Sequence, residues 1–210
     1  MVARPIETSD EELLAAAERV LLTQGPSGFT LAKAAERAGV SAATFVKRFG
    51  SKDALFLRLS QRWVAGLNGQ LRRCADARAS PLAKFRAVAL HNYHDLDNPS
   101  TASMQLAALA VDLQNDQMRE LLHIGWGHVR THLARHARAA IDAGELIRCP
   151  PPAQLARIVL GAMEGGCLLW SVHPTGSLIS RLGADLDATL GAWTTQKPQK
   201  FAMGRKEVTR

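Results

Sequence analysis

Apolar residues recur every three or four positions along most of the chain, the spacing of one face of an α-helix. The first such stretch covers about residues 10–23; it follows the capping-box sequence Thr8-Ser9-Asp10-Glu11 and stops at Gly25-Pro26. Two short helices follow within residues 30–49, and longer ones over about residues 51–78, 82–94, 101–113, 116–143, 153–173 and 176–194. Runs of β-branched residues are scarce, so the pattern predicts an all-α fold of about nine helices.

The two short helices within residues 30–49 are separated by a tight turn. Thr30 and Ser41 are suited to cap them, because each hydroxyl can accept an N–H of the first helical turn. Gly39 can take the left-handed backbone that ends a helix, and Phe45 and Phe49 fall on the buried side of the second helix. This is the pattern of a helix-turn-helix, whose second helix enters the DNA major groove. An ordinary helical hairpin with a solvated charged face has the same spacing.

The outer side of the second helix is expected to face DNA. Its alanines and valine have no hydrogen-bond donors and would meet thymine methyl groups, so base reading would come from Lys47 or Arg48. Lys52, in the first turn of the next helix, is expected to clamp a phosphate. The predicted DNA-binding residues are Thr30, Ser41, Ala42, Ala43, Thr44, Val46, Lys47, Arg48 and Lys52.

The net charge of +7 is unevenly distributed along the 210 residues. Residues 1–80 hold 12 Lys and Arg against 8 Asp and Glu, a balance of +4. The balance is −1 over residues 81–196 and +4 over residues 197–210. A basic excess on the N-terminal third of the chain, which contains the helix-turn-helix, favours a polyanionic partner. An excess of this size is also explained by a role in solubility alone.

Residues 7–66 resemble the N-terminal domain of the tetracycline-repressor (TetR) family of bacterial regulators. The similarity runs through Leu-Ala-Lys-Ala-Ala at 31–35, Ala-Gly-Val-Ser at 38–41 and Ser-Lys-Asp-Ala-Leu at 51–55, with Thr44 and Phe49 at the family spacing. The resemblance implies a homodimer that represses transcription on palindromic double-stranded DNA and is released by a small-molecule effector. Two positions differ: Val46 stands where the family usually has a phosphate-binding tyrosine, and Ala43 where it often has glycine.

The remainder of the chain is predicted to form a helical ligand-binding and dimerisation domain over residues 67–196, followed by a basic, disordered tail over residues 197–210. Large apolar side chains in it would line a ligand pocket or belong to the core. The ligand-binding candidates are Leu67, Leu71, Phe85, Tyr93, Met104, Trp126, Met163 and Trp170.

The last two predicted helices are expected to pair with their copies in a four-helix bundle, since one of them is apolar nearly all round and carries glycines. The same stripe would also suit the core of a monomer. The predicted dimer-interface residues are Gly161, Gly165, Leu168, Leu169, Leu178, Leu182, Leu186 and Leu190.

No other motif in the sequence predicts an enzyme, a cofactor or a metal site. His128, His132 and His136 are spaced to chelate a metal from one helix, but a solvated edge is the preferred interpretation. A helical metal-dependent enzyme and an interaction module that has lost DNA binding are the alternatives.

The expected compartment is the cytoplasm. Cys74, Cys149 and Cys167 form no CxxC and suit reduced thiols, and the N-terminus does not resemble a signal peptide. The most apolar stretch, residues 155–170, is judged too short and too charged for a membrane span, so no membrane partner is predicted.

Overall fold

The computed structural model describes residues 8–195, and within them the fold is all-α, as predicted, with one isolated β-bridge between Leu146 and Thr194. The tail predicted over residues 197–210 lies outside the described residues, as does residue 7 of the predicted N-terminal domain. In chain order the helices are α1 (Asp10–Gly28), α2 (Leu31–Ala38), α3 (Ala42–Phe49), α4 (Lys52–Asp76), α5 (Pro81–Leu90), the 3-10 helix η1 (His91–Leu96), α6 (Pro99–Asp112), α7 (Asp116–Asp142), α8 (Pro152–Val172) and α9 (Leu178–Leu190).

Local side-chain chemistry explains where these helices begin. Ser9 and Glu12 form a reciprocal capping box at the start of α1, and Ser51 accepts the N–H of Ala54 at the start of α4. Several helix ends differ from the prediction, and α9 ends at Leu190 where residue 194 was expected. Helix α1 continues past Gly25, which makes a kink with φ of 66°, and α5 ends at Leu90, where the chain tightens into η1.

The buried side chains form two separate clusters. The N-terminal cluster consists of residues from α1, α2, α3 and the start of α4, together with Phe29 and with Met118 of α7, and its fully buried side chains include Phe29, Phe45 and Leu55. The second cluster fills the body from Leu67 to Leu190. Helix α4 belongs to both, because its first half carries Leu55 and Phe56 and its second half carries Leu67, Leu71 and Ala75.

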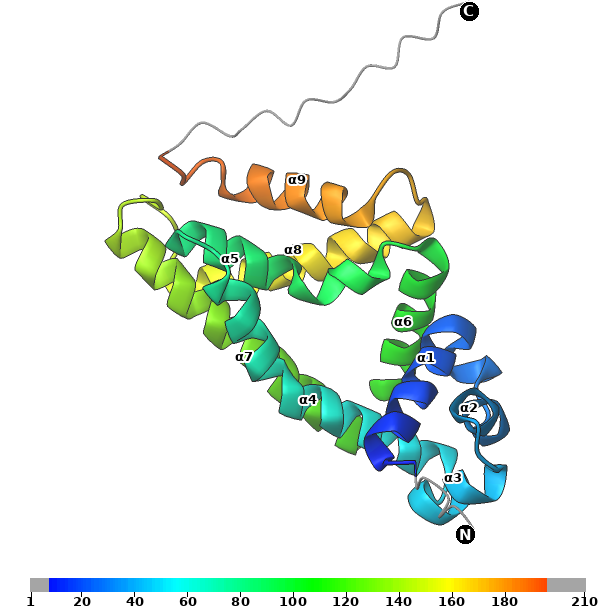
Figure 1. Cartoon of the computed structure of the whole chain (residues 1–210). Helices are drawn as coiled ribbons and strands as arrows, with labels where there is room; N and C mark the ends of the chain where they lie inside the picture. Colours follow the sequence, from blue (N-terminus) through cyan, green and yellow to red (C-terminus); the bar gives the residue numbers. More distant parts are fainter. Residues whose placement is uncertain (1–7, 196–210) are drawn as a thin grey trace, which may run out of the picture.

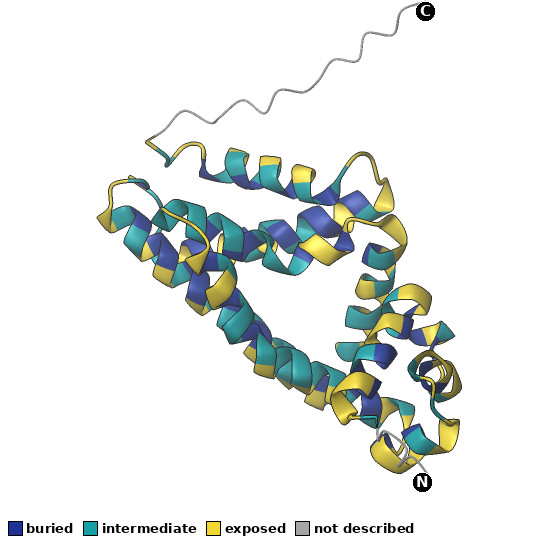
Figure 2. Cartoon of the chain, viewed as in Figure 1, coloured by how far each residue is buried: buried dark blue, intermediate teal, exposed yellow. Residues whose placement is uncertain are grey.

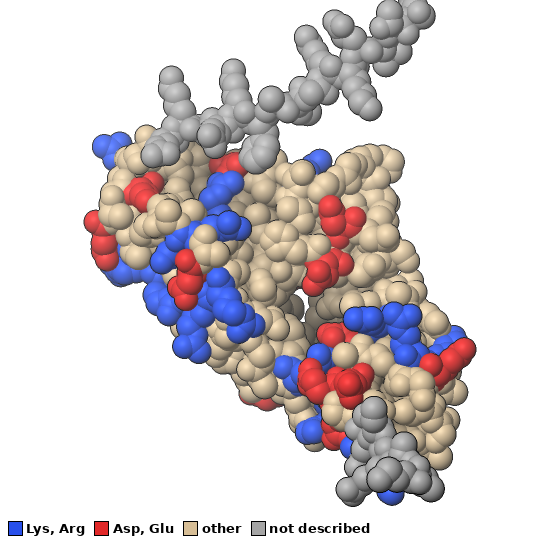
Figure 3. Space-filling view, viewed as in Figure 1, with Lys and Arg blue, Asp and Glu red and all other residues tan. Residues whose placement is uncertain are grey.

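The helices are arranged in a triangle (Figure 1). Helices α4 and α7 lie side by side along one edge, α5, η1, α8 and α9 make the second, and α6 meets α1 along the third. Buried positions follow the contacts between helices, while α2 and α3 expose much of their outer surface at one corner (Figure 2). The space-filling view shows that the molecule is hollowed near the middle of the triangle (Figure 3).

Two glycines allow neighbouring helices along the edges of the triangle to approach closely. A Cβ on Gly125 of α7 would lie 2.2 Å from the ring of Trp63, so this glycine makes room for the tryptophan of α4. A Cβ on Gly25, at the kink of α1, would lie 2.4 Å from the sulfur of Met104 on α6. The N-terminal cluster is therefore joined to the body twice, through α4 and through α6.

Helix α8 is the one helix of the described chain that is long and apolar enough, by length and composition alone, to cross a membrane. At 21 residues it is longer than the stretch seen in the sequence, so the prediction that it is too short was wrong. One face of α8 packs against α7 and α9 in the body core, which accounts for part of its apolar character.

The leucines of α9 belong to the core of their own chain. Leu178, Leu182, Leu186 and Leu190 are all buried there, and a Cβ on Gly166 of α8 would lie 2.6 Å from a methyl group of Leu182. The prediction that these four leucines line a dimer interface was therefore wrong. A stripe of leucines on a helix looks the same in a sequence whether it faces its own chain or a partner.

Candidate nucleic-acid interface

Helices α2 and α3 are held in place by capping hydrogen bonds and a glycine turn. Thr30 Oγ1 accepts the N–H of Lys33 at 3.2 Å, and Ser41 Oγ accepts the N–H of Thr44 at 3.3 Å. Gly39 lies in the left-handed region, with φ of 68°, and Val40 N–H donates to Ala35 O across the end of α2. The local geometry is that of a helix-turn-helix.

Helix α3 is anchored by its two phenylalanines. Phe45 and Phe49 are buried in the N-terminal cluster, and their ring centroids lie 5.5 Å apart. The opposite face of α3 is open: Ala42, Ala43 and Lys47 are exposed, and Val46 keeps 52% of its surface in solvent. This face is small and apolar with one cation, as the sequence predicted, and it is free to enter a groove.

Several basic residues near α3 are occupied inside the chain. Arg48 forms an ion pair with Asp10 of α1 at 2.6 Å, so it turns back toward α1 rather than out from the face that carries Val46. Lys52 Nζ donates to Pro26 O at 2.5 Å and lies 5.5 Å from the centroid of Phe56. Lys33 Nζ donates to Gly28 O at 2.8 Å. A phosphate would have to compete with these bonds for Lys52, whereas Lys47 projects from the open face.

Comparisons with known proteins show which class of regulators has a similar helix-turn-helix. Residues 13–59 match the sequence model of the bacterial regulatory proteins of the tetR family. Over 171 residues the chain is 27% identical to the HTH-type transcriptional regulator BetI of Paraburkholderia xenovorans (strain LB400), covering 80% of this chain and 86% of that protein. Residues 13–59 therefore form a DNA-binding domain of the TetR type. The chain is a DNA-binding transcriptional regulator.

Solved structures of other transcriptional regulators share the fold over nearly the whole chain. SmeT, the repressor of the Stenotrophomonas maltophilia multidrug efflux pump SmeDEF, is 23% identical with a TM-score of 0.65, over 97% of this chain and 97% of that one. FadR from Bacillus subtilis, in complex with stearoyl-CoA, is 15% identical with a TM-score of 0.67, over 87% of this chain and 98% of that one. At these identities the similarity establishes the arrangement of helices and leaves the ligand of this chain open.

The eight predicted ligand-binding residues do not come together as one pocket lining. Six of them are buried as members of the body core: Leu67, Leu71, Phe85, Tyr93, Met163 and Trp170. Met104 instead touches Gly25 at the kink of α1, so its predicted ligand role is replaced by a contact between the body and the N-terminal cluster. Trp126 is half-buried on α7.

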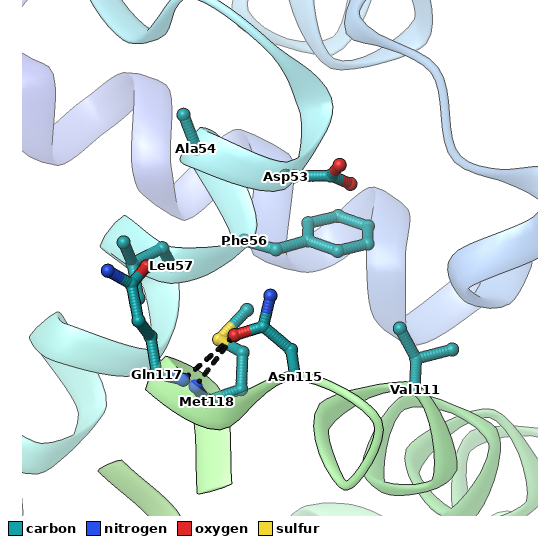
Figure 4. A pocket seen from close by; sticks show the side chains of 8 residues that line it. All are labelled: Asp53, Ala54, Phe56, Leu57, Val111, Asn115, Gln117 and Met118. Carbon is teal, nitrogen blue, oxygen red and sulfur yellow. Dashed lines mark hydrogen bonds between the residues drawn. The ribbon is translucent and has the colours of Figure 1, made fainter. Parts of the chain in front are cut away.

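The described cavities lie instead at the junction between the N-terminal cluster and the body. A cavity of about 270 Å³ is lined by the first turns of α4, by the end of α6, by Asn115 in the turn that follows and by the start of α7. Asp53 and Phe56 of α4 face Val111 and Asn115 across it (Figure 4). The Asn115 side chain accepts the N–H groups of the first turn of α7, which fixes that turn against α4. None of the predicted ligand residues lines this cavity.

A polar network that the sequence did not predict ties α4 to α7. Asn68 of α4 lies 3.2 Å from a ring nitrogen of His128 and 3.2 Å from one of His132. Arg135 donates to His132 at 3.0 Å and to His136 at 3.4 Å, so the ring nitrogens that receive these bonds carry no proton. His132 and His136 are buried, and the interpretation of both as part of a solvated edge was wrong.

This network makes the stability of the fold depend on pH. Burial, followed by the charges of Arg135, His132 and Lys84, lowers the pKa of His136 to about 4, with Asp76 acting in the opposite direction. In the unfolded chain His136 is protonated below about pH 6.5, whereas in the folded chain it is protonated only below about pH 4. The free energy of unfolding therefore decreases as the pH falls from about 6.5 to about 4.

We expect acidification from about pH 7 to about pH 5 to remove roughly 2 kcal/mol through His136 alone. His136→Gln should flatten the dependence of unfolding free energy on pH by that amount, because glutamine does not titrate. The measurement is urea unfolding at several pH values. His123→Gln, a change at an exposed position on the same helix, is the control. Parallel pH profiles for wild type and H136Q would show that His136 takes up its proton over the same pH range in the folded and the unfolded chain.

Proposed function

We propose that the chain acts as a homodimeric repressor that binds a palindromic operator in the cytoplasm and leaves the DNA when a small molecule binds the body. The observation that carries the proposal is the open face of α3, held outward by two buried phenylalanines and two capping hydroxyls. A two-fold dimer presents two such helices to successive major grooves, about 34 Å apart. We assign DNA recognition to residues 7–66, with the recognition motif at 30–49, and the remaining functions to residues 67–196.

The outward face of α8 supports the dimer. Leu168, Leu169 and Val172 are exposed at 52%, 74% and 79%, and a Cβ placed on Gly161 or Gly165 would meet nothing within 4 Å. These positions recur at helical spacing along one side of the helix, so they form a continuous apolar surface without bulk at its centre. A second copy of the helix can approach closely there, and its burial would remove the leucines from water.

The two junctions between the N-terminal cluster and the body explain how a ligand would act on DNA binding. Helix α4 carries residues of both cores on one rigid element, and Trp63 fixes it against Gly125 of α7. Met104 fixes α6 against the kink of α1. A ligand that favours a body with shifted α4 or α6 would change the separation of the two α3 helices and weaken DNA binding. The bound stearoyl-CoA of FadR and the repressor role of SmeT support this mechanism by analogy.

An interaction module that has lost DNA binding is the second candidate. Three observations favour it: Val46 occupies the position of the usual tyrosine, Arg48 is paired with Asp10, and Lys52 is bonded to Pro26. In that case the chain would show no salt-sensitive affinity for DNA.

Lys47→Ala distinguishes the two candidates. Because Lys47 is the cation on the open face of α3, its loss should relax base preference at one position per half-site by about 1–3 kcal/mol. Val46→Tyr should tighten binding to all sequences alike, because a tyrosine hydroxyl there would reach phosphate and not a base.

The measurement is a titration of purified protein against operator and mismatched duplexes at several salt concentrations. Arg138→Ala, at an exposed position on α7, is the matched control for loss of one positive charge and should change neither preference nor affinity. If K47A leaves base preference intact, or V46Y changes the preferred sequence, then the face of α3 carrying Val46 and Lys47 does not meet the bases.

A further inference from the structure

The cavity of about 270 Å³ between the start of α4 and the start of α7, here called the junction cavity, has an apolar lining. Phe56 and Met118 line it, and both are buried members of the N-terminal cluster. Val111, at the end of α6, lines the same cavity but keeps 44% of its surface in solvent. A small apolar molecule in the junction cavity would remove this valine from water, which is favourable.

Two polar side chains at the junction cavity have unused hydrogen-bonding capacity. The side-chain oxygen of Asn115 accepts the N–H groups of Gln117 and Met118 at 3.0 and 3.1 Å. Its amide nitrogen has no partner among residues 8–195 and points toward α4 (Figure 4). The carboxylate of Asp53 forms no ion pair or hydrogen bond within the same part of the chain. A donor and an acceptor therefore border one apolar space.

We propose that the junction cavity binds a phenol. The ring would lie against Phe56, Val111 and Met118, and the hydroxyl would lie between Asp53 and Asn115. A hydroxyl can donate to a carboxylate while it accepts from an amide N–H, so it satisfies both polar groups. A cavity of about 150 Å³ is enough for benzene, so the junction cavity has room for one ring with a short substituent.

The inference rests on the proposed function, because it names the chemical class of the ligand and places it between α4, α6 and α7. The lining of the junction cavity favours a neutral hydroxyl over a charged group. No lysine or arginine lines it, so an anionic ligand would meet only the carboxylate of Asp53. A cation would meet the donating nitrogen of Asn115 and the N-terminal ends of α4 and α7, which carry partial positive charge.

Phe56 connects the junction cavity with the residues that hold the helix-turn-helix. Its ring packs edge-on against Phe29, with 5.0 Å between centroids, and Lys52 Nζ lies 5.5 Å from its centroid while it donates to Pro26 O. Helix α3 ends at Phe49 and α4 begins at Lys52. A ring bound against Phe56 would therefore act where α4 joins α3. A ligand that prefers one arrangement of this junction changes the affinity for DNA, and DNA changes the affinity for the ligand by the same factor.

The test compares 4-ethylphenol with ethylbenzene, which differs only in lacking the hydroxyl. Titrated by calorimetry into the full-length protein at neutral pH, the phenol should bind at least about tenfold more tightly, which corresponds to roughly 1.4 kcal/mol. Asp53→Ala should bring the two affinities to within about twofold of each other, because the acceptor of the hydroxyl proton is lost. Asp116→Ala is the matched control: it removes the first-turn acid of α7, which pairs with Arg119 and does not line the cavity.

A second pair of variants tests the apolar part of the site. Val111→Trp should fill the junction cavity and abolish binding of both compounds. Leu113→Trp, which adds the same ring at an exposed position outside the cavity, should leave both affinities unchanged. A folded V111W variant that binds 4-ethylphenol as wild type does would place the phenol elsewhere.

The unaltered protein separates the junction cavity from the body core. In spectra of protein labelled with ¹³C at the methionine methyl groups, 4-ethylphenol should shift the signal of Met118, and that of Met163 in the body core should stay in place. A shift at Met163 without one at Met118, equal affinity for both compounds, or absence of phenol binding would overturn the inference. Affinity for DNA is measured separately: a phenol that shifts Met118 without weakening DNA binding would contradict the proposed release mechanism and leave this site standing.

Discussion

Phe45→Ala should unfold the N-terminal cluster and abolish DNA binding while the body stays folded. Phe45 is fully buried, packs against Phe49, and lies on the face of α3 opposite Val46. Removing such a ring leaves a cavity and costs about 3–5 kcal/mol. The two cores are separate, so the loss should fall on the cluster that holds α3 in position.

Phe85→Ala is the matched control for this prediction, because Phe85 is equally buried in the body core. Limited proteolysis and thermal unfolding followed by circular dichroism report on both variants. F45A should expose cleavage sites within residues 10–50 and lose DNA binding, and F85A should destabilise the body first. If F45A unfolds the entire chain in one step with the same loss as F85A, α4 transmits the damage and the two cores form one cooperative unit.

Leu169→Asp should convert the dimer into monomers and weaken operator binding with it. Leu169 is 74% exposed on α8, next to the open surface around Gly165. Two-fold symmetry brings two copies of the substitution into one interface, and losing the burial of two leucine side chains costs about 4 kcal/mol, or roughly a thousandfold in dissociation constant. The two carboxylates that the substitution adds to the interface would weaken the dimer further.

Sedimentation velocity across a range of concentrations measures this effect. Ile124→Asp, which places the same charge at an exposed apolar position on α7, should remain dimeric. Gly165→Leu should also separate the protomers, since a large side chain would hold the two α8 helices apart. Dimers of wild-type strength in L169D would place the interface on another surface of the molecule.

The sequence predicts features that depend on neighbouring residues. Thr30 and Ser41 cap their helices, Gly39 takes the left-handed turn and Phe45 is buried, because each outcome depends on residues within one or two helical turns. The exposed face of α3 follows directly from those assignments. The all-α fold follows from the periodicity in the same way.

The sequence does not predict contacts between distant residues. Arg48 pairs with Asp10 and Lys52 with Pro26 only because α1 folds back over α3 and the start of α4. From the sequence Met104 is expected in the core or in a ligand pocket. Its contact with Gly25 depends on the position of the α1 kink, which the sequence pattern does not predict.

Selection from randomised duplexes by the purified protein tests whether the open face of α3 contacts bases as part of a two-fold dimer. We expect enrichment of a palindrome whose half-sites lie about one helical turn apart and contain a thymine-rich step and one preferred guanine, with affinity that falls as salt is raised. Recovery of sequences without any shared half-site, or binding that salt does not weaken, would contradict this role of α3.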